Sequence, residues 1–186
     1  MKKRAFPALL LLAALLCCGC STEKEPVSEG TASGEVQESA VSVDPDALVT
    51  GILEKYGMVD GFVFTSSSTE PGEYLDDDLI ASYYGDAAQS PDFSKVSRYC
   101  VYVDESNAKA LIDVGLFELN DPSYGAELMQ YLQRRIDDKI DAAVRYTDID
   151  VAMLKTAVVK QEGAWVYYSV NYDAAAIADE LAGALS

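Results

Sequence analysis

Histidine is absent from the 186 residues of this chain. Histidine is the commonest general base of enzymes and the commonest ligand of transition metals, because its imidazole titrates near neutral pH. Its absence excludes Ser-His-Asp triads, Cys-His dyads and zinc sites built on histidine. Any chemistry at a site of this protein must therefore come from carboxylates, amines, hydroxyls or a thiol.

Positive charge is scarce. The chain has 14 Lys and Arg residues against 31 Asp and Glu residues, which gives a formal net charge of −17 at pH 7. Such a charge repels the phosphate backbone of nucleic acids, and no basic stripe interrupts it. The sequence therefore predicts no nucleic-acid partner.

The first residues have the pattern of an export signal. Lys2, Lys3 and Arg4 precede an apolar stretch from Ala5 to Cys18. A charged segment followed by a short apolar segment and a small residue is typical of a signal peptide. The stretch is shorter than the about 20 residues that a helix needs to cross a bilayer. We therefore expect residues 1–19 to be a signal peptide.

The run Leu16-Cys17-Cys18-Gly19-Cys20 resembles the lipobox of bacterial lipoproteins, although Cys17 stands where leucine is usual. The resemblance implies that Cys20 becomes the mature N-terminus and carries a diacylglyceryl group with fatty acids such as palmitate. It also implies a lipid-anchored protein on the outer face of the bacterial cytoplasmic membrane. The alternatives are a secreted form without lipid and an uncleaved anchor.

Composition divides the rest of the chain into two parts. Residues 20–43 are rich in Ser, Thr, Glu and Gly and contain no aromatic residue, which predicts a disordered acidic linker. Residues 44–186 have the size of a single domain and contain no internal repeat. The one thiol of this domain, Cys100, lies in an apolar run and is expected to be buried.

Hydrophobic periodicity and capping residues predict the elements of this domain. Helices are expected from Asp44-Pro45 to Gly57, from Asp76 or Asp77 to Gly85, from Pro122 to about Val144 or Tyr146, and over 174–185. Strands are expected over 97–103, 110–119, 151–160 and 165–172, with a possible edge strand over 61–65. The order is α-(β)-α-β-β-α-β-β-α. The predicted fold class is α+β, an antiparallel sheet of two hairpins with helices packed on one face.

The long helix predicted from Pro122 is strongly amphipathic. Apolar residues recur on one face, while its charged residues fall largely off that face. Those charged residues are Arg134, Arg135, Asp137, Asp138 and Asp141. Asp141–Arg145 and the weaker Arg134–Asp138 are interpreted as i, i+4 ion pairs on a solvated face, and each is expected to contribute little to stability.

Carboxylates are the most obvious candidates for chemistry. The triplet Asp76-Asp77-Asp78 could bind a hard cation, but successive residues of a helix point about 100° apart and do not converge on one ion. A helix cap is the favoured interpretation. With 31 acids in the chain, a pair at glycosidase spacing is not specific. No catalytic, cofactor-binding or metal-binding residue is predicted, and no cofactor.

Aromatic residues are the remaining feature, with 12 Tyr, 5 Phe and one Trp. Strand alternation places Trp165 and Tyr167 on one face of the sheet and Val166 and Tyr168 on the other. The usual explanation is core packing on one face and half-buried, hydrogen-bonded tyrosine on the other. The alternative is an exposed aromatic face for a cationic or carbohydrate partner.

The order of elements also resembles a known family. The run Ala108-Lys-Ala-Leu-Ile-Asp-Val-Gly-Leu-Phe-Glu-Leu, the long helix after it, the Val158–Tyr168 hairpin and the Tyr84-Gly85 step resemble a family of uncharacterised lipoproteins of low-GC Gram-positive bacteria. That family is classed only as a domain of unknown function. The resemblance covers about residues 47–172. It implies a fold and a location, and it carries no catalytic residue.

These observations together predict a membrane-anchored extracytoplasmic lipoprotein whose acidic domain is a binding or envelope-interaction module and not an enzyme. Its predicted partners are the membrane, through diacylglyceryl-Cys20, and an envelope protein or a cationic ligand. One alternative is a carboxylate-only enzyme that acts on cell-envelope glycans. Another is an accessory subunit of an envelope complex. The oligomeric state and the binding of a cation by Asp76–Asp78 stay open.

Overall fold

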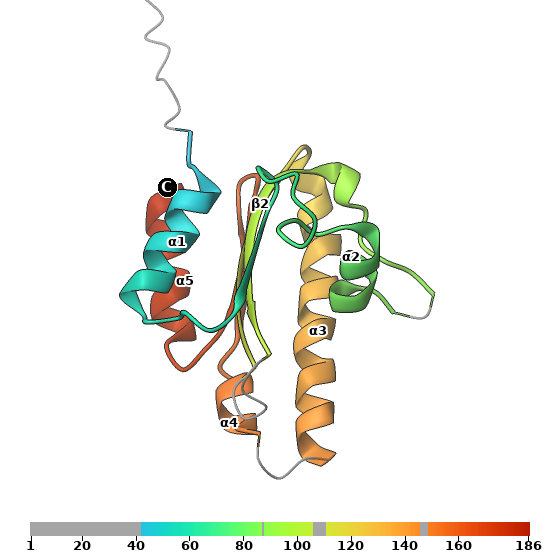
Figure 1. Cartoon of the computed structure of the whole chain (residues 1–186), viewed down its shortest axis with the longest axis vertical. Coiled ribbons are helices and arrows are strands. Elements are labelled where there is room, and N and C mark those ends of the chain that lie inside the picture. Colours follow the sequence, from blue (N-terminus) through green and yellow to red (C-terminus); the bar gives the residue numbers. More distant parts are fainter. Residues whose placement is uncertain (1–41, 87, 106–110, 146–148) are drawn as a thin grey trace, which may run out of the picture. The chain divides into compact units, whose positions relative to one another are not determined.

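Five antiparallel strands form one sheet in the order β1-β2-β3-β5-β4 in the computed structural model, which describes residues 42–86, 88–105, 111–145 and 149–186 (Figure 1). The elements are α1 (Pro45–Lys55), β1 (Phe62–Thr65), α2 (Asp77–Tyr84), β2 (Val96–Asp104), β3 (Ile112–Leu119), α3 (Gly125–Arg145), α4 (Val151–Leu154), β4 (Val158–Glu162), β5 (Trp165–Val170) and α5 (Ala174–Leu185), with short 3-10 helices at Phe93–Lys95 and Pro122–Tyr124. The predicted α+β class, the two hairpins β2-β3 and β4-β5 and the edge strand β1 are confirmed.

The helices cover both faces of the sheet, so the predicted packing on one face is wrong. Helices α1 and α5 lie on one side, and α2 and α3 lie on the other (Figure 1). The physical reason is the alternation of β2, where both sets of side chains are apolar. Tyr99, Val101 and Val103 face α2 and α3, while Cys100 and Tyr102 face α1 and α5. Each apolar face of the sheet must be covered.

The two faces form separate cores of unequal composition. The α3 side packs Leu128, Leu132 and Ile136 against Phe117 and Tyr168 of the sheet, and it is rich in aromatic contacts. The α5 side packs aliphatic side chains of α1 and α5 against residues such as Leu116 and Tyr167. The central strand β3 therefore contributes to both cores and has almost no exposed surface.

The segment after α3 departs from the predicted strand over 151–160. Its first residues form the short helix α4, and β4 begins only at Val158. Asp150 explains the difference, because its carboxylate accepts a hydrogen bond from the Met153 amide and starts a helical turn. Met153 and Leu154 lie on that turn and are buried.

Residues 1–41 lie outside the described residues, and so do the predicted signal peptide, Cys20 and nearly all of the predicted linker. The described residues, from 42 onward, belong to one compact unit. Within the part of the chain that the structure describes, no helix is both long and apolar enough to cross a membrane.

Candidate functional site

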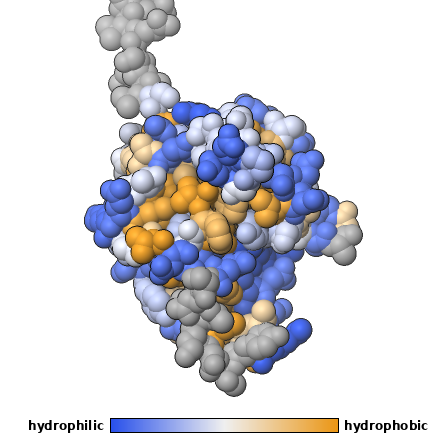
Figure 2. All heavy atoms as spheres, viewed as in Figure 1, coloured by the Kyte–Doolittle hydropathy of each residue, from blue (hydrophilic) through white to orange (hydrophobic). Residues whose placement is uncertain are grey.

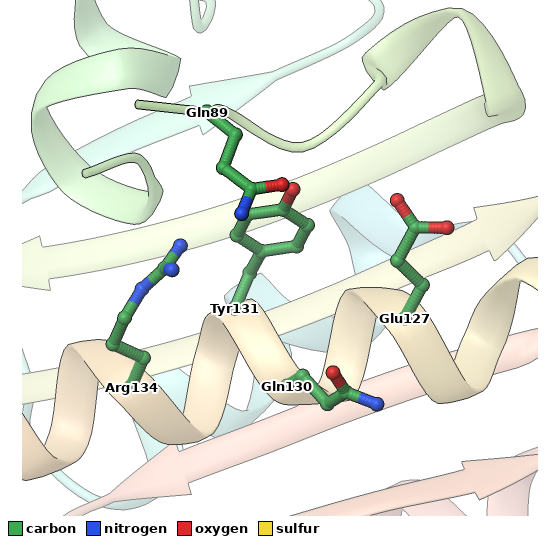
Figure 3. A pocket seen from close by; sticks show the side chains of 5 residues that line it. All are labelled: Gln89, Glu127, Gln130, Tyr131 and Arg134. Atoms are coloured by element: carbon green, nitrogen blue, oxygen red, sulfur yellow. The ribbon is translucent and has the colours of Figure 1, made fainter. Parts of the chain in front are cut away.

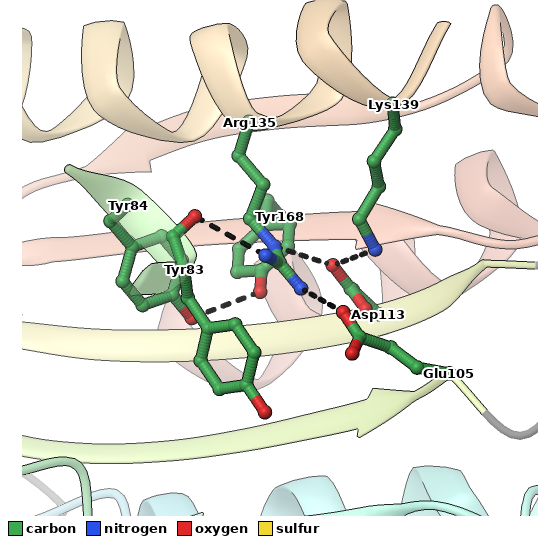
Figure 4. A network of polar contacts seen from close by, with 7 residues as sticks. All are labelled: Tyr83, Tyr84, Glu105, Asp113, Arg135, Lys139 and Tyr168. Carbon is green, nitrogen blue, oxygen red and sulfur yellow. Dashed lines mark hydrogen bonds and ion pairs between the residues drawn. The ribbon is translucent and has the colours of Figure 1, made fainter. Parts of the chain in front are cut away.

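A carboxylate is buried in the middle of the sheet. Asp113 lies near the start of β3, fully buried, on the face that α3 covers. Its Oδ2 atom accepts hydrogen bonds from Arg135 Nε and from Lys139 Nζ, each at 2.8 Å (Figure 4). Arg135 and Lys139 are four residues apart on α3 and therefore share one face of the helix. We call these three residues the ion cluster.

Helix α2 fixes the guanidinium of Arg135 from the other side. Arg135 Nη1 donates to the Tyr83 carbonyl oxygen at 3.2 Å. The guanidinium carbon lies 4.6 Å from the centroid of the Tyr83 ring and 5.6 Å from that of the Tyr84 ring, which is cation–π geometry. The Tyr84 hydroxyl is 3.2 Å from the hydroxyl of Tyr168 on β5. The arginine is thereby held in one orientation by two helices and the sheet.

The pKa values of the ion cluster depend on a competition between burial and the neighbouring charges. Burial favours the neutral form of Asp113, but the two adjacent cations outweigh it and lower the pKa of that carboxyl. Burial also lowers the pKa of Lys139, and the nearby Arg135 charge acts in the same direction, while Asp113 opposes both. Arg135 shifts in the other direction, because the attraction of Asp113 raises the pKa of its guanidinium in spite of burial.

An unsatisfied polar group lies at one edge of Arg135. Its Nη2 atom is buried and has no hydrogen-bond partner among the described residues. Glu105 Oε1 lies 3.6 Å from Nη2, an ion pair beyond hydrogen-bond distance, and the Glu105 side chain is 52% exposed. Asp113 Oδ1 is also without a hydrogen bond within the described part of the chain. A buried polar group in this state is costly unless a partner reaches it.

Arg135 is one of the residues that line a cleft of about 240 Å³ beside α2 and α3. The residues that matter in its lining are Tyr83, Glu105, Leu111, Arg135, Asp138 and Lys139. Two cations therefore form its floor, two carboxylates stand in its wall, and an aromatic and an aliphatic side chain complete it. A concave site with a few convergent polar groups is the usual form of a small-ligand site.

A second hollow contains the neighbouring Arg134 but differs in one respect (Figure 3). Arg134 Nη1 donates to Asp86 at 2.5 Å, and its Nη2 donates to the Tyr84 carbonyl oxygen at 3.1 Å. Its guanidinium also lies over the Tyr131 ring, 4.8 Å from the centroid. Both terminal nitrogens of Arg134 are thus occupied, so this hollow offers no comparable free donor on its arginine.

Most of the residues that the sequence singled out have a structural role. Asp76 caps α2 by accepting from the Leu79 amide, as predicted. Cys100 is buried, as predicted, and burial raises the pKa of its thiol to about 12. In the described ranges, no group of three or more His, Cys, Asp or Glu residues could hold a metal ion. Tyr167 and Tyr168 are fully buried, so they do not form the exposed aromatic face of the alternative interpretation.

The ion cluster was not predicted. Arg135 lies off the apolar stripe of α3, as expected, but it is buried and not solvated, because α2 and Asp113 of β3 contact its side chain. Two signals were available in the sequence. Asp113 interrupts an apolar strand, and Arg135 and Lys139 are spaced i, i+4 on the helix that follows. Nothing local in the sequence shows that strand and helix bring these residues together.

An apolar patch lies apart from the cleft, at the open edge of β1. Val59, Phe62 and Val63 are exposed there, Phe62 by 68% and Val59 by 78%. Figure 2 shows apolar side chains gathered across the face that carries β1. β1 is an edge strand of the sheet, and exposed apolar side chains at a sheet edge are a common place for contact with another chain.

The fold therefore defines the class of this protein as an α+β domain with a charged cleft beside α2 and α3. No model of a protein family, no curated protein and no solved structure matches the chain. Its function must be argued from its own residues.

Proposed function

We propose that this protein is a lipid-anchored extracytoplasmic binding protein, held on the outer face of the bacterial cytoplasmic membrane through Cys20, whose domain binds a small ligand in the Arg135 cleft. The observation that carries the binding role is the buried Nη2 atom of Arg135, a charged donor without a hydrogen bond at a cleft. The signal-like segment and the lipobox-like run before Cys20 support the location.

The chemistry of the cleft favours binding over catalysis. A glycosidase needs two carboxyl groups free to protonate a leaving group and to attack or activate water. Glu105 and Asp138 both line the cleft, but Glu105 is directed to Arg135 and the floor beneath it is cationic. The chain also has no histidine to act as a general base. A preformed cationic floor instead suits recognition of a charged ligand.

The anchor is tested by replacing Cys20 with alanine. We expect the wild-type chain, produced in a Gram-positive host, to fractionate with the membrane and to incorporate labelled palmitate, and C20A to lose both properties, because the thioether carries the lipid. Cys18→Ala is the matched control and should stay lipidated. Membrane retention of C20A would overturn the anchor at Cys20, and loss of label in C18A alone would move the anchor to Cys18.

The binding role is tested by thermal unfolding of the full chain against a panel of small carboxylates, inorganic phosphate, divalent cations, polyamines and soluble cell-wall fragments. A ligand that binds only the folded state should add about 2.7 kcal/mol of stability at 100 times its dissociation constant, which raises the melting temperature by several degrees. We expect at least one class to do so. No shift with any class would contradict the small-ligand role.

The second candidate function is an accessory subunit of an envelope complex, which the exposed patch of Val59, Phe62 and Val63 at the β1 edge favours. The two candidates differ in the panel experiment. A small-ligand protein responds to one chemical class, whereas a subunit that acts only through the β1 edge responds to none.

A further inference from the structure

We propose that the cleft recognises an organic carboxylate. The carboxylate group binds Arg135 Nη2 and Lys139, next to the position that Glu105 has in the structure. The inference rests on the proposed function, because it names the ligand class of the same cleft. It reverses the charge of the ligand expected from composition, since a protein with a net charge of −17 would attract cations at most of its surface.

The first argument is the charge balance of the buried groups. Arg135 and Lys139 are both more than nine-tenths buried, with side-chain exposures of 7% and 9%, and Asp113 is the one fully buried carboxylate that contacts them. The buried part of the cluster therefore has one positive charge in excess. Buried charges without partners are costly, so a bound monoanion would complete the cluster.

The second argument is the direction of the free donors. Arg135 uses Nε on Asp113 and Nη1 on the Tyr83 carbonyl, which leaves Nη2. Lys139 Nζ carries three protons and makes one hydrogen bond within the described residues, to Asp113. Both side chains line the cleft. An arginine edge beside an ammonium is a good match for the two oxygens of a carboxylate.

The third argument separates a carboxylate from a phosphate. The excess charge of the buried cluster is one, and the carboxylates of Glu105 and Asp138 stand in the wall of the cleft. A dianion would be repelled by these acids and only half compensated by the floor. The Leu111 and Ala142 side chains and the Tyr83 ring provide an apolar surface for the part of the ligand that bears the carboxylate.

Glu105 gives the proposal its sharpest test. It is half exposed and 3.6 Å from Nη2, so it competes for the arginine without being fixed to it. Removing its charge should open the site to an external carboxylate. We expect Glu105→Gln to tighten binding of N-acetylalanine to the full chain about three- to tenfold, measured by NMR titration that follows the side-chain Nε–H signals of arginine at constant ionic strength.

Two controls make this result specific. Glu54→Gln on α1 removes the same charge on the opposite face of the sheet and should leave the affinity unchanged. Lys139→Met keeps the Asp113–Arg135 pair but removes the second cation, and should weaken binding about tenfold. Circular dichroism checks that each variant is folded; if K139M is not, Lys139→Arg, which keeps the charge, should bind within about threefold of wild type.

The probes separate the possible ligands. N-acetylalaninamide lacks the charge and should not bind, and inorganic phosphate should bind more weakly than N-acetylalanine. Equal binding of the amide, tighter binding of phosphate, or no effect of E105Q would overturn the proposal. If another class of the panel stabilises the chain and carboxylates do not, the proposed function stands and this inference fails; if no class does, the proposed function fails as well.

Discussion

Replacing Asp113 with alanine should lower the free energy of unfolding of the full chain by about 3 to 5 kcal/mol. The substitution leaves Arg135 and Lys139 buried without their shared carboxylate, and both hydrogen bonds of 2.8 Å are lost. Removing one partner of a buried ion cluster is costly because the remaining charges cannot return to water. Urea unfolding followed by circular dichroism measures the change.

A matched ion pair on the same strand supplies the control. Glu118 pairs with Arg98 at 2.6 Å, but both side chains are partly exposed. Glu118→Ala should cost about 1 kcal/mol or less, because water solvates the arginine that remains. An Asp113→Ala variant that is no less stable than Glu118→Ala would show that water reaches the ion cluster freely.

A further variant separates stability from binding. Replacing Asp113, Arg135 and Lys139 together with Leu, Met and Leu should keep or raise the stability, since apolar side chains of similar volume carry no desolvation cost. The same variant should lose binding of N-acetylalanine. An ion cluster that the fold does not need for stability is more easily explained by a ligand.

The pH dependence of stability follows from the lowered pKa of Asp113. Burial raises that pKa, but the attraction of Arg135 and Lys139 outweighs it. Because the folded state holds the carboxylate more acidic than the unfolded state does, its contribution is fully present above the ordinary value near 3.8 and is lost as pH falls through the folded value. The stability that Asp113→Ala removes should therefore shrink below about pH 4.

Local signals in the sequence were sufficient for most elements of the domain, with α4 as the exception. Asp44 and Asp76 accept from amides of the first turns of α1 and α2, as their positions before a proline and an apolar repeat predicted. Gly163 has a positive φ of 56° in the β4-β5 turn, as the hairpin required. Capping, turn chemistry and periodicity act within a few residues, so one sequence shows them.

The site depends on contacts between distant residues, which one sequence does not show. Asp113 lies 22 residues before Arg135 in the chain, and Tyr83 lies 52 residues before it. The packing of helices on both faces of the sheet also depends on contacts between distant residues. A strand with two apolar faces predicts burial on both sides, but the expectation of a single helical layer assigned the tyrosines of one face to half-buried positions instead.

Gly115 should not tolerate even a methyl group. It lies in the central strand β3 opposite Tyr168, and a Cβ atom there would come within 2.3 Å of Tyr168 Cε1 and 2.9 Å of its Cδ1. The ring cannot move aside easily, because it stacks on Phe117 with ring centroids 6.2 Å apart and its hydroxyl contacts Tyr84. We expect Gly115→Ala to destabilise the full chain by about 2 to 3 kcal/mol, measured by urea unfolding.

The same substitution elsewhere in the chain should have the opposite sign. Gly51 lies inside α1 and is exposed, with nothing within 4 Å of a Cβ atom. Gly51→Ala should therefore stabilise the chain by about 0.5 to 1 kcal/mol, since alanine favours a helix interior.

A second variant isolates the clash at Gly115. If the ring of Tyr168 is the obstacle, Gly115→Ala should cost much less in a Tyr168→Leu background than alone. Additive costs would place the strain elsewhere in the sheet.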